Sequence, residues 1–369
     1  MKKSLIALAA VAASGAAFAQ SSVTVFGVVD AAVSYVDGGT NWSGLASGAN
    51  STSRIGFRGV EDLGGGLKAN FWLEAGVNLD NGDGTSGFTA TSGRSGDGLS
   101  FKRRSTVGLE GAFGEVRLGR DQTEAYKITS RYDVFGQVGF GASKVWADAD
   151  VTATSQNTYT TNQRVSNAIT YVSPSFSGFR VAGNYGFGES ANGNSDGRYL
   201  GLAAGYDNGP LSLGLGLERL NAGNVVPAQG GAALPMLSDI NTWSLGGSYN
   251  FGVVKVLAGY RDSEAKLDTT GAKSKLKGYY LGLSAPVGAA GEVKASYNRY
   301  DRTTNAGVEA KADHFSLGYV HNMSKRTAVY GTYSYLKNKN NGTAFNLSSN
   351  ATLDNGKQQG LQVGVRHAF

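Results

Sequence analysis

The sequence predicts an all-β protein, a 16-stranded antiparallel transmembrane β-barrel, and three observations predict this fold class. Apolar and polar residues alternate with a period of two from end to end, whereas helical periodicity is almost absent. The alternating segments are about ten residues long, which is the length that a tilted strand needs to cross a bilayer. Their connections alternate between short turns and long polar loops, an asymmetry that is typical of transmembrane barrels.

The N-terminal residues are expected to form a signal peptide. Lys2 and Lys3 precede a short apolar run, and Ala17-Phe18-Ala19 forms an A-x-A cleavage site. The apolar run is too short to span a bilayer. We therefore expect residues 1–19 to be removed and residues 20–369 to form a single barrel.

The segment 67–75 illustrates the alternation along a strand. One face carries Leu67, Ala69, Phe71, Leu73 and Ala75, and the other carries Lys68, Asn70, Trp72 and Glu74. A soluble β-sandwich would also alternate, but its second face would not hold lysine, asparagine and glutamate in a dry core. These residues suit a water-filled lumen, so the apolar face is expected to contact lipid.

The same reading along the whole chain predicts sixteen strands, an even number that places both termini on the periplasmic side. The expected strands are 23–36, 52–61, 66–79, 100–111, 114–121, 163–173, 178–188, 198–207, 210–220, 241–252, 253–263, 276–286, 291–302, 312–321, 326–338 and 358–369. The long loops are 37–51, 79–99, 121–162, 221–240 and 337–357, and they are rich in Gly, Ser, Asn and Thr.

Other classes of function fit the composition poorly. Cysteine is absent and only three histidines occur, so no thiolate or histidine-cluster metal site and no cofactor is expected. The charge is basic, but no Lys/Arg run exceeds Lys102-Arg103-Arg104, which argues against nucleic acid as a partner. Ser316 and His314 share a lumen face without a surrounding catalytic motif, so we do not expect an enzyme.

Several stretches together resemble the Gram-negative general porins, most closely the trimeric betaproteobacterial type. They are SSVTVFGVVD (21–30), SRIGFRG (53–59), RRSTVGLEGAFGEVRLGR (103–120), NAITYVSPSFSG (167–178) and the ending VRHAF (365–369). The resemblance implies a homotrimer in the outer membrane of a Gram-negative bacterium, surrounded by outer-membrane lipid and lipopolysaccharide. It also implies that the third loop, 121–162, folds inward, and that the barrel-assembly machinery recognises Phe369.

Arginines on the lumen face are the first candidates for the narrow point of the pore. Alternation places Arg54 and Arg58 inside, with Ile55 and Phe57 toward lipid. The opposite orientation would cost about 2 to 4 kcal/mol for an arginine at the bilayer midplane. We therefore expect Arg54 and Arg58 at the constriction.

Arg103 and Arg104 cannot both face inward on a regular strand. The family pattern favours Arg103, whereas counting back from Val107 and Leu109 favours Arg104. We select Arg103 for the constriction. The resemblance also implies that Arg164 contributes, since it directly precedes the motif of the sixth strand.

The opposite wall is expected to come from the 121–162 loop, because structureless loops longer than about 15 residues are usually functional. Of its acidic residues, Glu124 and Asp133 are the candidates for the constriction. Asp133 lies in the turn-like stretch YDVFG, which resembles the tip of the family's third loop. Lys68 and Glu74 are expected to line the pore wall in either case.

These residues predict a diffusion channel for small hydrophilic solutes and ions. Arginine remains charged at physiological pH, so an arginine excess at the narrow point predicts anion preference. The alternative is a solute-specific channel, which would carry a row of aromatic side chains along the lumen. Most aromatic residues, such as Phe71, Tyr185 and Phe315, fall on the expected lipid face, and Trp72 is the exception.

Overall fold

The computed structural model describes residues 22–84, 98–147, 163–188, 197–221, 237–267 and 270–369. The expected signal peptide, residues 1–19, lies outside the described residues, as do parts of three of the five predicted long loops, including 148–162 of the third. Among the described residues, no helix is long and apolar enough to cross a membrane.

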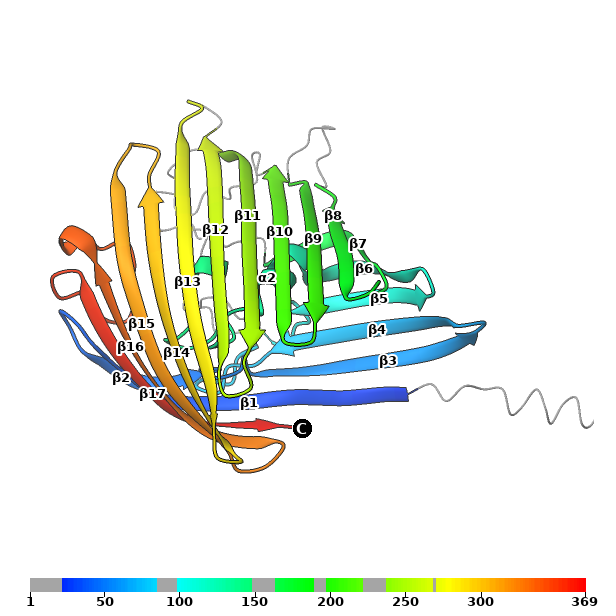
Figure 1. Ribbon diagram of the computed structural model, residues 1–369, viewed down its shortest axis with the longest axis horizontal. Helices are drawn as coiled ribbons and strands as arrows, with labels where there is room; N and C mark the ends of the chain where they lie inside the picture. Colours follow the sequence, from blue (N-terminus) through cyan, green and yellow to red (C-terminus); the bar gives the residue numbers. More distant parts are fainter. Residues whose placement is uncertain (1–21, 85–97, 148–162, 189–196, 222–236, 268–269) are drawn as a thin grey trace, which may run out of the picture.

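Seventeen strands form one antiparallel sheet, and Figure 1 shows them as a continuous curved wall. They are β1 (Ser22–Asp37), β2 (Trp42–Ser47), β3 (Arg54–Gly64), β4 (Leu67–Gly76), β5 (Arg104–Gly111), β6 (Gly114–Gln122), β7 (Arg164–Val172), β8 (Phe179–Gly186), β9 (Tyr199–Asn208), β10 (Leu211–Asn221), β11 (Leu237–Asn250), β12 (Lys255–Leu267), β13 (Lys273–Val287), β14 (Gly291–Thr303), β15 (Glu309–Asn322), β16 (Thr327–Asn338) and β17 (Lys357–Ala368). The described residues also form three short helices: α2 (Glu124–Ser130), α3 (Lys144–Ala147) and the 3₁₀ helix η1 (Lys339–Asn341).

The sheet closes into a barrel because β1 pairs with β17. The other edge of β1 is shared: β3 pairs with its first half, Ser22–Val28, and β2 with its second half, Ala31–Val36. β2 and β3 therefore occupy one position around the wall, and the barrel is 16-stranded, as predicted. Closure pairs the first and last strands of the sheet with each other, which a bilayer requires of β-structure.

The sixteen predicted strands all occur, with ends that differ by a few residues. β2 was not predicted, since it falls in the expected loop 37–51. β2 forms because β1 is long and extends beyond the end of β3. The second half of β1 would expose unsatisfied backbone groups on that side, and the chain returns along it to pair with them.

The outer face of the barrel is apolar. Alternate residues of each strand, such as Val25, Leu213, Leu245, Leu281 and Val363, are exposed hydrophobic side chains. Their sequence neighbours point inward and are mostly small or polar. This is the lipid-out, water-in arrangement of a transmembrane barrel, and it agrees with the alternation in the sequence.

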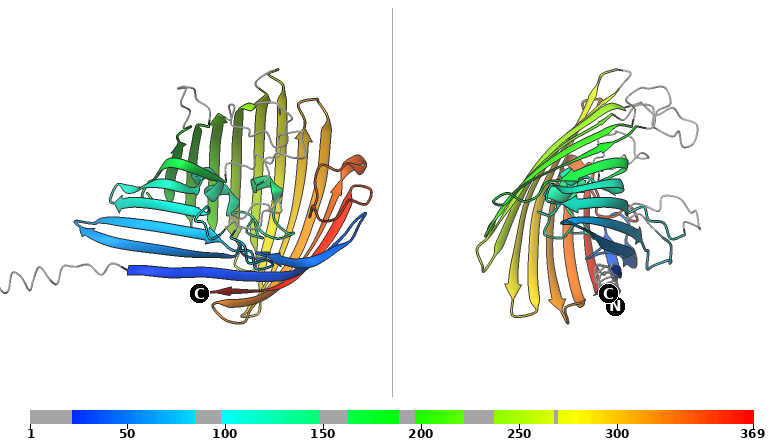
Figure 2. Two further views of the ribbon diagram at one scale, coloured as in Figure 1. Left: turned by 180° about the vertical axis from the view of Figure 1, so that it is seen from behind. Right: turned by 90° about the vertical axis from the view of Figure 1, so that its right-hand side faces the viewer.

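The described part of the third loop lies on the inner face of the sheet, where α2 and α3 contact strands β8 to β14 (Figure 2). The contact is close because the strands carry glycines, with no side chain, at the positions that the loop contacts. A Cβ atom on Gly246 would overlap the Tyr132 ring, and one on Gly259 would overlap the Trp146 indole.

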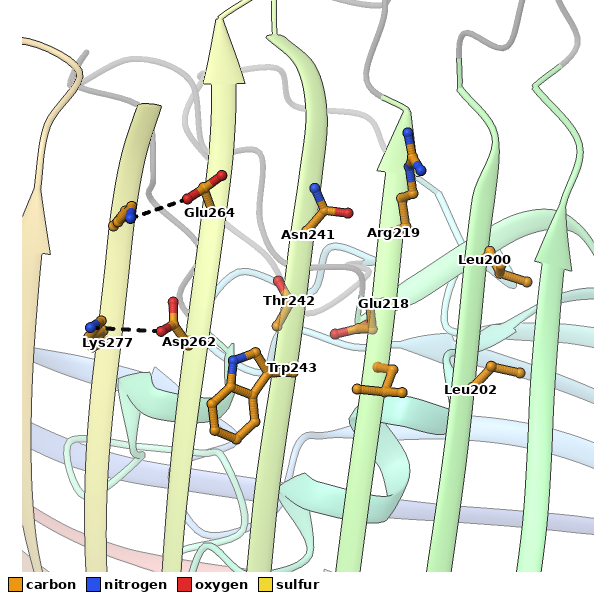
Figure 3. Close-up of a pocket in the computed structure, with 12 residues that line it drawn as sticks. Leu200, Leu202, Glu218, Arg219, Asn241, Thr242, Trp243, Asp262, Glu264 and Lys277 are labelled. Carbon is orange, nitrogen blue, oxygen red and sulfur yellow. Dashed lines mark ion pairs between the residues drawn. The ribbon is translucent and has the colours of Figure 1, made fainter. Parts of the chain in front are cut away.

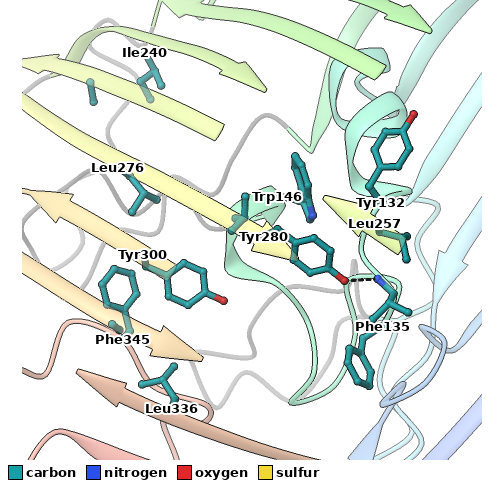
Figure 4. Packing of buried hydrophobic residues seen from close by; sticks show 14 residues of the cluster. Tyr132, Phe135, Trp146, Ile240, Leu257, Leu276, Tyr280, Tyr300, Leu336 and Phe345 are labelled. Carbon is teal, nitrogen blue, oxygen red and sulfur yellow. Dashed lines mark hydrogen bonds between the residues drawn. The ribbon is translucent and has the colours of Figure 1, made fainter. Parts of the chain in front are cut away.

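An apolar cluster fixes this part of the loop to the wall, and Figure 4 shows it. Tyr132, Phe135 and Trp146 from the loop pack with Leu257 and Tyr280 from the strands. The Val134 backbone N–H donates a hydrogen bond of 2.7 Å to the Tyr280 hydroxyl. The main apolar core of the molecule therefore lies inside the barrel, between the loop and one side of the wall.

Candidate pore constriction

A cavity of about 780 Å³ lies inside the barrel between the loop and the opposite side of the wall. Strands β3 and β4, Arg103 just before β5, and the start of β7 form one side. The loop segment from Gly136 to Lys144 forms the other, and Asn346 and Leu347 add to the lining. Most charged side chains of the cavity belong to the strand side.

Arg54, Glu74 and Arg103 form a cluster on that side. Arg103 Nε lies 2.6 Å from Glu74 Oε1, and Arg54 Nε lies 4.0 Å from the same oxygen. Cross-strand pairing explains the proximity: Arg54 is aligned with Gly76 in β4, and Arg104 with Glu74. Glu74, which was expected only to line the wall, is thus the ionic partner of two candidate constriction arginines.

Arg164 is hydrogen-bonded to Arg103 of the same cluster. Its Nε donates a hydrogen bond of 2.9 Å to the backbone carbonyl of Arg103, and its side chain lines the cavity. Tyr126 from α2 lines the cavity nearby. Burial raises the pKa of the Tyr126 phenol to about 12, so this group is neutral at physiological pH and adds no negative charge beside Arg164.

Arg103 and Arg104 both face the interior, which corrects the expectation that only one of them could. β5 begins at Arg104, so Arg103 precedes the strand and is not bound by its alternation. Arg103 is 9% exposed and lines the cavity. Arg104 lies over the Trp72 ring and 3.5 Å from Asp121 Oδ2, so it belongs to a neighbouring ionic group.

Arg58 lies between two aromatic rings. Its guanidinium carbon is 5.3 Å from the ring centre of Phe26 and 5.3 Å from that of Trp72. The two rings contact each other edge to face, with centres 4.9 Å apart. Phe26 was missed in the sequence, although it alternates with the outward Val23 and Val25 and so had to point inward.

Glu124 lies away from the cavity, contrary to the prediction. It is 6% exposed at the start of α2, where Arg117 is its ion-pair partner and Lys127 Nζ is 2.9 Å away. Its backbone N–H donates to Asn184 Oδ1 at 2.6 Å. The carboxylate is thus neutralised between the helix and the wall, because the start of α2 turns toward β6 and β8 and not toward the open lumen.

Asp133 also lies away from the lining of the cavity. It is 5% exposed and accepts hydrogen bonds from the backbone N–H groups of Phe135, Gln137 and Ser143, at 2.9, 3.1 and 2.9 Å. Its carboxylate organises the turn that carries the cavity-facing loop segment. The family-like loop tip is therefore present, but its acidic residue supports the fold of the loop.

Lys68 lies on the inner face of β4, at the start of the strand beside the turn at Gly64–Gly66. Its cross-strand neighbours are Asp62 and Glu110. It is exposed, and it is not part of the cavity lining. That Lys68 lines the pore wall stays a prediction.

Lys144, in α3, was not singled out in the sequence, yet it lines the cavity. Strand alternation cannot place a residue inside an irregular loop, so no sequence signal identified it. The charged residues of the described lining are Arg54, Arg58, Arg103, Lys144, Arg164 and Glu74. They comprise five cations and one carboxylate.

The Ser316–His314 pair forms a hydrogen bond, with Ser316 Oγ 3.0 Å from His314 Nε2. His314 Nδ1 lies 3.0 Å from the Tyr300 hydroxyl. His314 is 1% exposed and Ser316 is fully buried, so the serine hydroxyl is not accessible to a substrate. The pair contributes to the polar packing of the inner wall.

Phe369 lies on the outer face at the seam between the first and last strands. Its backbone N–H and carbonyl each form a 3.1 Å hydrogen bond with Gly27, and its side chain is 46% exposed toward the lipid side. The role of Phe369 as an assembly signal stays a prediction.

Comparisons with known proteins agree with this architecture. A family model described as Gram-negative porin matches residues 5–341. The chain is 44% identical to outer membrane porin protein 32 of Delftia acidovorans over the full length of both chains. An anion-selective porin from Comamonas acidovorans has a TM-score of 0.79 and 42% identity, covering 95% of this chain and 100% of that chain.

A more distant solved structure shares the fold. OmpT of Vibrio cholerae in its trimer form has a TM-score of 0.66 at 17% identity, covering 95% of this chain and 99% of that one. With a closed 16-stranded barrel, a lipid-type outer face and full-length similarity to outer-membrane porins, the chain belongs to the Gram-negative porin family and forms a channel in the outer membrane.

Proposed function

We propose that this porin is an anion-preferring diffusion channel and that the 780 Å³ cavity is its constriction. The observation that carries the proposal is the charge of the lining, five cations against one carboxylate. The relative from Comamonas acidovorans is named an anion-selective porin, which supports the same preference here.

The arrangement of these charges favours anions at physiological salt. Arg103 is the arginine that Glu74 neutralises at short range, and Arg58 and Arg164 have no carboxylate partner among the ion pairs described above. The Debye length is about 10 Å at 0.1 M salt, so charges that ring a narrow passage act on every ion that passes. Anions are concentrated there and cations are repelled.

The third loop sets the width of this passage in the proposal. In its described part, α2 and α3 pack on the inner face of the wall, and Gly136 to Lys144 face the arginine side of the cavity.

The proposal includes two further elements. Residues 1–19 are removed on export, and the mature chain assembles as a homotrimer, the form in which the structurally similar OmpT is described.

The direct test is a reversal-potential measurement on the purified protein in a planar bilayer with a salt gradient. The proposal predicts anion preference at about 0.1 M salt and a smaller preference at about 1 M, where the Debye length falls to about 3 Å. Cation preference at the lower concentration would overturn it. N-terminal sequencing of the outer-membrane protein tests the processing site, with Gln20 expected first.

The second candidate is a solute-specific channel, favoured by Phe26 and Trp72 in the cavity lining. Both rings are engaged with Arg58, and Trp72 also with Arg104, so they hold arginines as well as offering a surface to a solute. Conductance that saturates with one organic anion and not with chloride would favour this alternative.

A further inference from the structure

Asp30 in β1 is a carboxylate on the inner face of the wall, and it is 0% exposed. It lies where one edge of β1 changes partner, since β3 pairs with β1 up to Val28 and β2 pairs with it from Ala31 onward. Residues 48–53 join β2 to β3 across this gap, and we call them the crossing segment. Asp30 is therefore the residue of β1 that faces the crossing segment where strand pairing is interrupted.

The carboxylate of Asp30 takes the place of a strand partner for the crossing segment. Its Oδ2 accepts hydrogen bonds from the backbone N–H groups of Asn50 and Ser51, at 2.9 and 2.6 Å. Its Oδ1 accepts a hydrogen bond from the Tyr330 hydroxyl. The Ser53 hydroxyl lies 3.0 Å from both the backbone nitrogen and the carbonyl oxygen of Asp30. Because backbone N–H groups without a strand partner need another acceptor, Asp30 fixes the backbone of this segment.

The crossing segment in turn holds the guanidinium of Arg54. Arg54 Nη1 donates a hydrogen bond of 2.9 Å to the Thr52 carbonyl and lies 3.5 Å from the Ser51 hydroxyl oxygen. The Glu74 carboxylate is farther away, at 4.0 Å from Arg54 Nε. Ser51, Thr52 and Arg54 all line the 780 Å³ cavity. The position of this cation in the cavity thus depends on the Thr52 carbonyl, and the position of that carbonyl depends on Asp30.

The third loop contacts the same segment from the other side of the cavity. A Cβ atom on Gly139 would lie 2.3 Å from the Ala49 carbonyl oxygen, so the two backbones are in close contact. The next residue, Phe140, donates its backbone N–H to Gln362 Oε1 at 2.7 Å. Gln362 Nε2 donates to the Ser34 hydroxyl at 3.0 Å. The crossing segment therefore supports both the arginine side and the loop side of the cavity.

We propose that Asp30 is a positioning residue of the constriction, acting through the crossing segment. Asp30 is fully buried and is not part of the described cavity lining, so it acts on permeating ions only through Arg54. It keeps the Arg54 guanidinium at the Thr52 carbonyl, apart from the Glu74 carboxylate. This role rests on the proposed function, because it takes the 780 Å³ cavity as the constriction.

The test compares two substitutions that remove the same charge. Asp30→Leu removes the acceptor, whereas Asp30→Asn keeps one oxygen for the two N–H groups and can donate its NH₂ to the Tyr330 hydroxyl. Loss of a negative charge from the wall does not by itself lower anion preference. We nevertheless expect Asp30→Leu to lower it toward the value of Arg54→Ser, because Arg54 moves onto Glu74. Asp30→Asn is expected to keep or raise it.

The measurement is the reversal potential of the full-length barrel in a planar bilayer with a salt gradient at about 0.1 M, where screening is incomplete. Equal shifts in the leucine and asparagine variants, or a rise in anion preference in the leucine variant, would overturn the role of Asp30. In the Arg54→Ser background, Asp30→Leu is expected to shift the potential no further, since both changes act on one network. Additive shifts would contradict the route through Arg54.

Two controls leave the crossing segment intact. Tyr330→Phe removes the hydrogen bond to Oδ1 of Asp30 and keeps both bonds to the backbone N–H groups. Glu218→Gln removes another buried carboxylate of the inner wall, in β10 (Figure 3), whose Oε1 lies 2.7 Å from the Tyr199 hydroxyl oxygen. Neither is expected to lower anion preference. A fall as large as that of Asp30→Leu in either control would count against the role of Asp30.

A second readout does not depend on ion preference. The chain has no cysteine, so Thr52→Cys places a single thiol in the crossing segment. We expect a small methanethiosulfonate reagent to modify it about three- to tenfold faster with Asp30→Leu than with Asp30→Asn, the factor of one typical hydrogen bond. Equal rates would refute the role of Asp30. Cation preference of the wild-type channel would instead overturn the proposed function and leave this comparison valid.

All variants are first checked for the heat-modifiable mobility of a folded barrel. If Asp30→Leu does not fold, Asp30→Ser replaces it, since the shorter serine hydroxyl does not reach both N–H groups. The same expectations then apply to Asp30→Ser, and unchanged reversal potential and modification rate in that variant would overturn the role of Asp30.

Discussion

The ring of Phe369 lies directly over Gly27, and the two residues exchange a pair of backbone hydrogen bonds of 3.1 Å. A Cβ atom on Gly27 would overlap the ring. The last residue of the chain is thus seated on the first strand, on the lipid side, at the point where the barrel closes.

Deletion of Phe369 is expected to reduce the yield of folded barrel in the outer membrane sharply. The deletion removes two hydrogen bonds at the seam and the terminal aromatic ring that the assembly machinery is proposed to recognise. The measurement is the amount of heat-modifiable protein in outer-membrane fractions. Wild-type amounts after the deletion would show that neither the seam nor the signal depends on this residue.

Gly27→Leu distinguishes the two roles of Phe369. The leucine side chain displaces the ring but leaves the terminal aromatic residue in the sequence. If packing at the seam matters, the variant barrel reaches the outer membrane and unfolds at lower temperature, with a cost of about 1–3 kcal/mol for an overpacked contact. Thermal unfolding of the purified protein measures this, with Gly98→Leu as the control, since a Cβ atom there meets no neighbour.

Gly246→Val is expected to lower single-channel conductance. The added side chain overlaps Tyr132 and pushes the loop away from β11, toward the arginine side of the cavity. Because the outer face is unchanged, the barrel still assembles. Adding Tyr132→Ala to the same chain should restore the conductance, and failure to do so would mean that the loop is not held through this contact.

Glu74→Gln is expected to raise anion preference and lower stability. It removes the single carboxylate of the cavity lining and leaves Arg103, 9% exposed, without its 2.6 Å partner. Breaking a buried ion pair costs about 3–5 kcal/mol. Reversal potential and thermal unfolding measure the two effects. The control is Glu309→Gln on the outer face, where neither quantity should change.

Arg164→Ser and Arg54→Ser are each expected to weaken anion preference, most clearly at low salt. Each removes one of five cations from the lining. Arg299→Ser is the matched control, since Arg299 points outward on β14 and pairs with Asp301 and Asp313. If the Arg299 variant shifts the reversal potential as much as the others, selectivity does not arise at the proposed constriction.

Strand alternation was sufficient to predict the wall of this barrel. Because a strand offers only two faces, the period of two placed Arg54, Arg58, Lys68 and Glu74 on the inner face. The same rule also implied Phe26. It misled at Arg103, because the residue lies just before the strand, where the backbone is no longer held in the alternating frame.

The loop could not be read in this way. Whether Glu124, Asp133 or Lys144 meets the lumen depends on how α2, α3 and the turn between them pack on the wall, which has no sequence period. The carboxylate of Asp133 accepts hydrogen bonds from backbone N–H groups of the loop and is buried there. Lys144 of α3 lines the cavity, whereas Glu124 and Asp133 do not.

Tyr132 packs against Gly246 and Trp146 against Gly259, and this packing has a consequence for how solute uptake can be regulated. Because both rings lie against the wall where a Cβ atom would overlap them, the described part of the loop has no room to move closer to β11 and β12. The width of the passage on that side is then set by the fold of the barrel. Uptake of nutrients, or of charged antibiotics, would accordingly scale with the number of copies in the membrane.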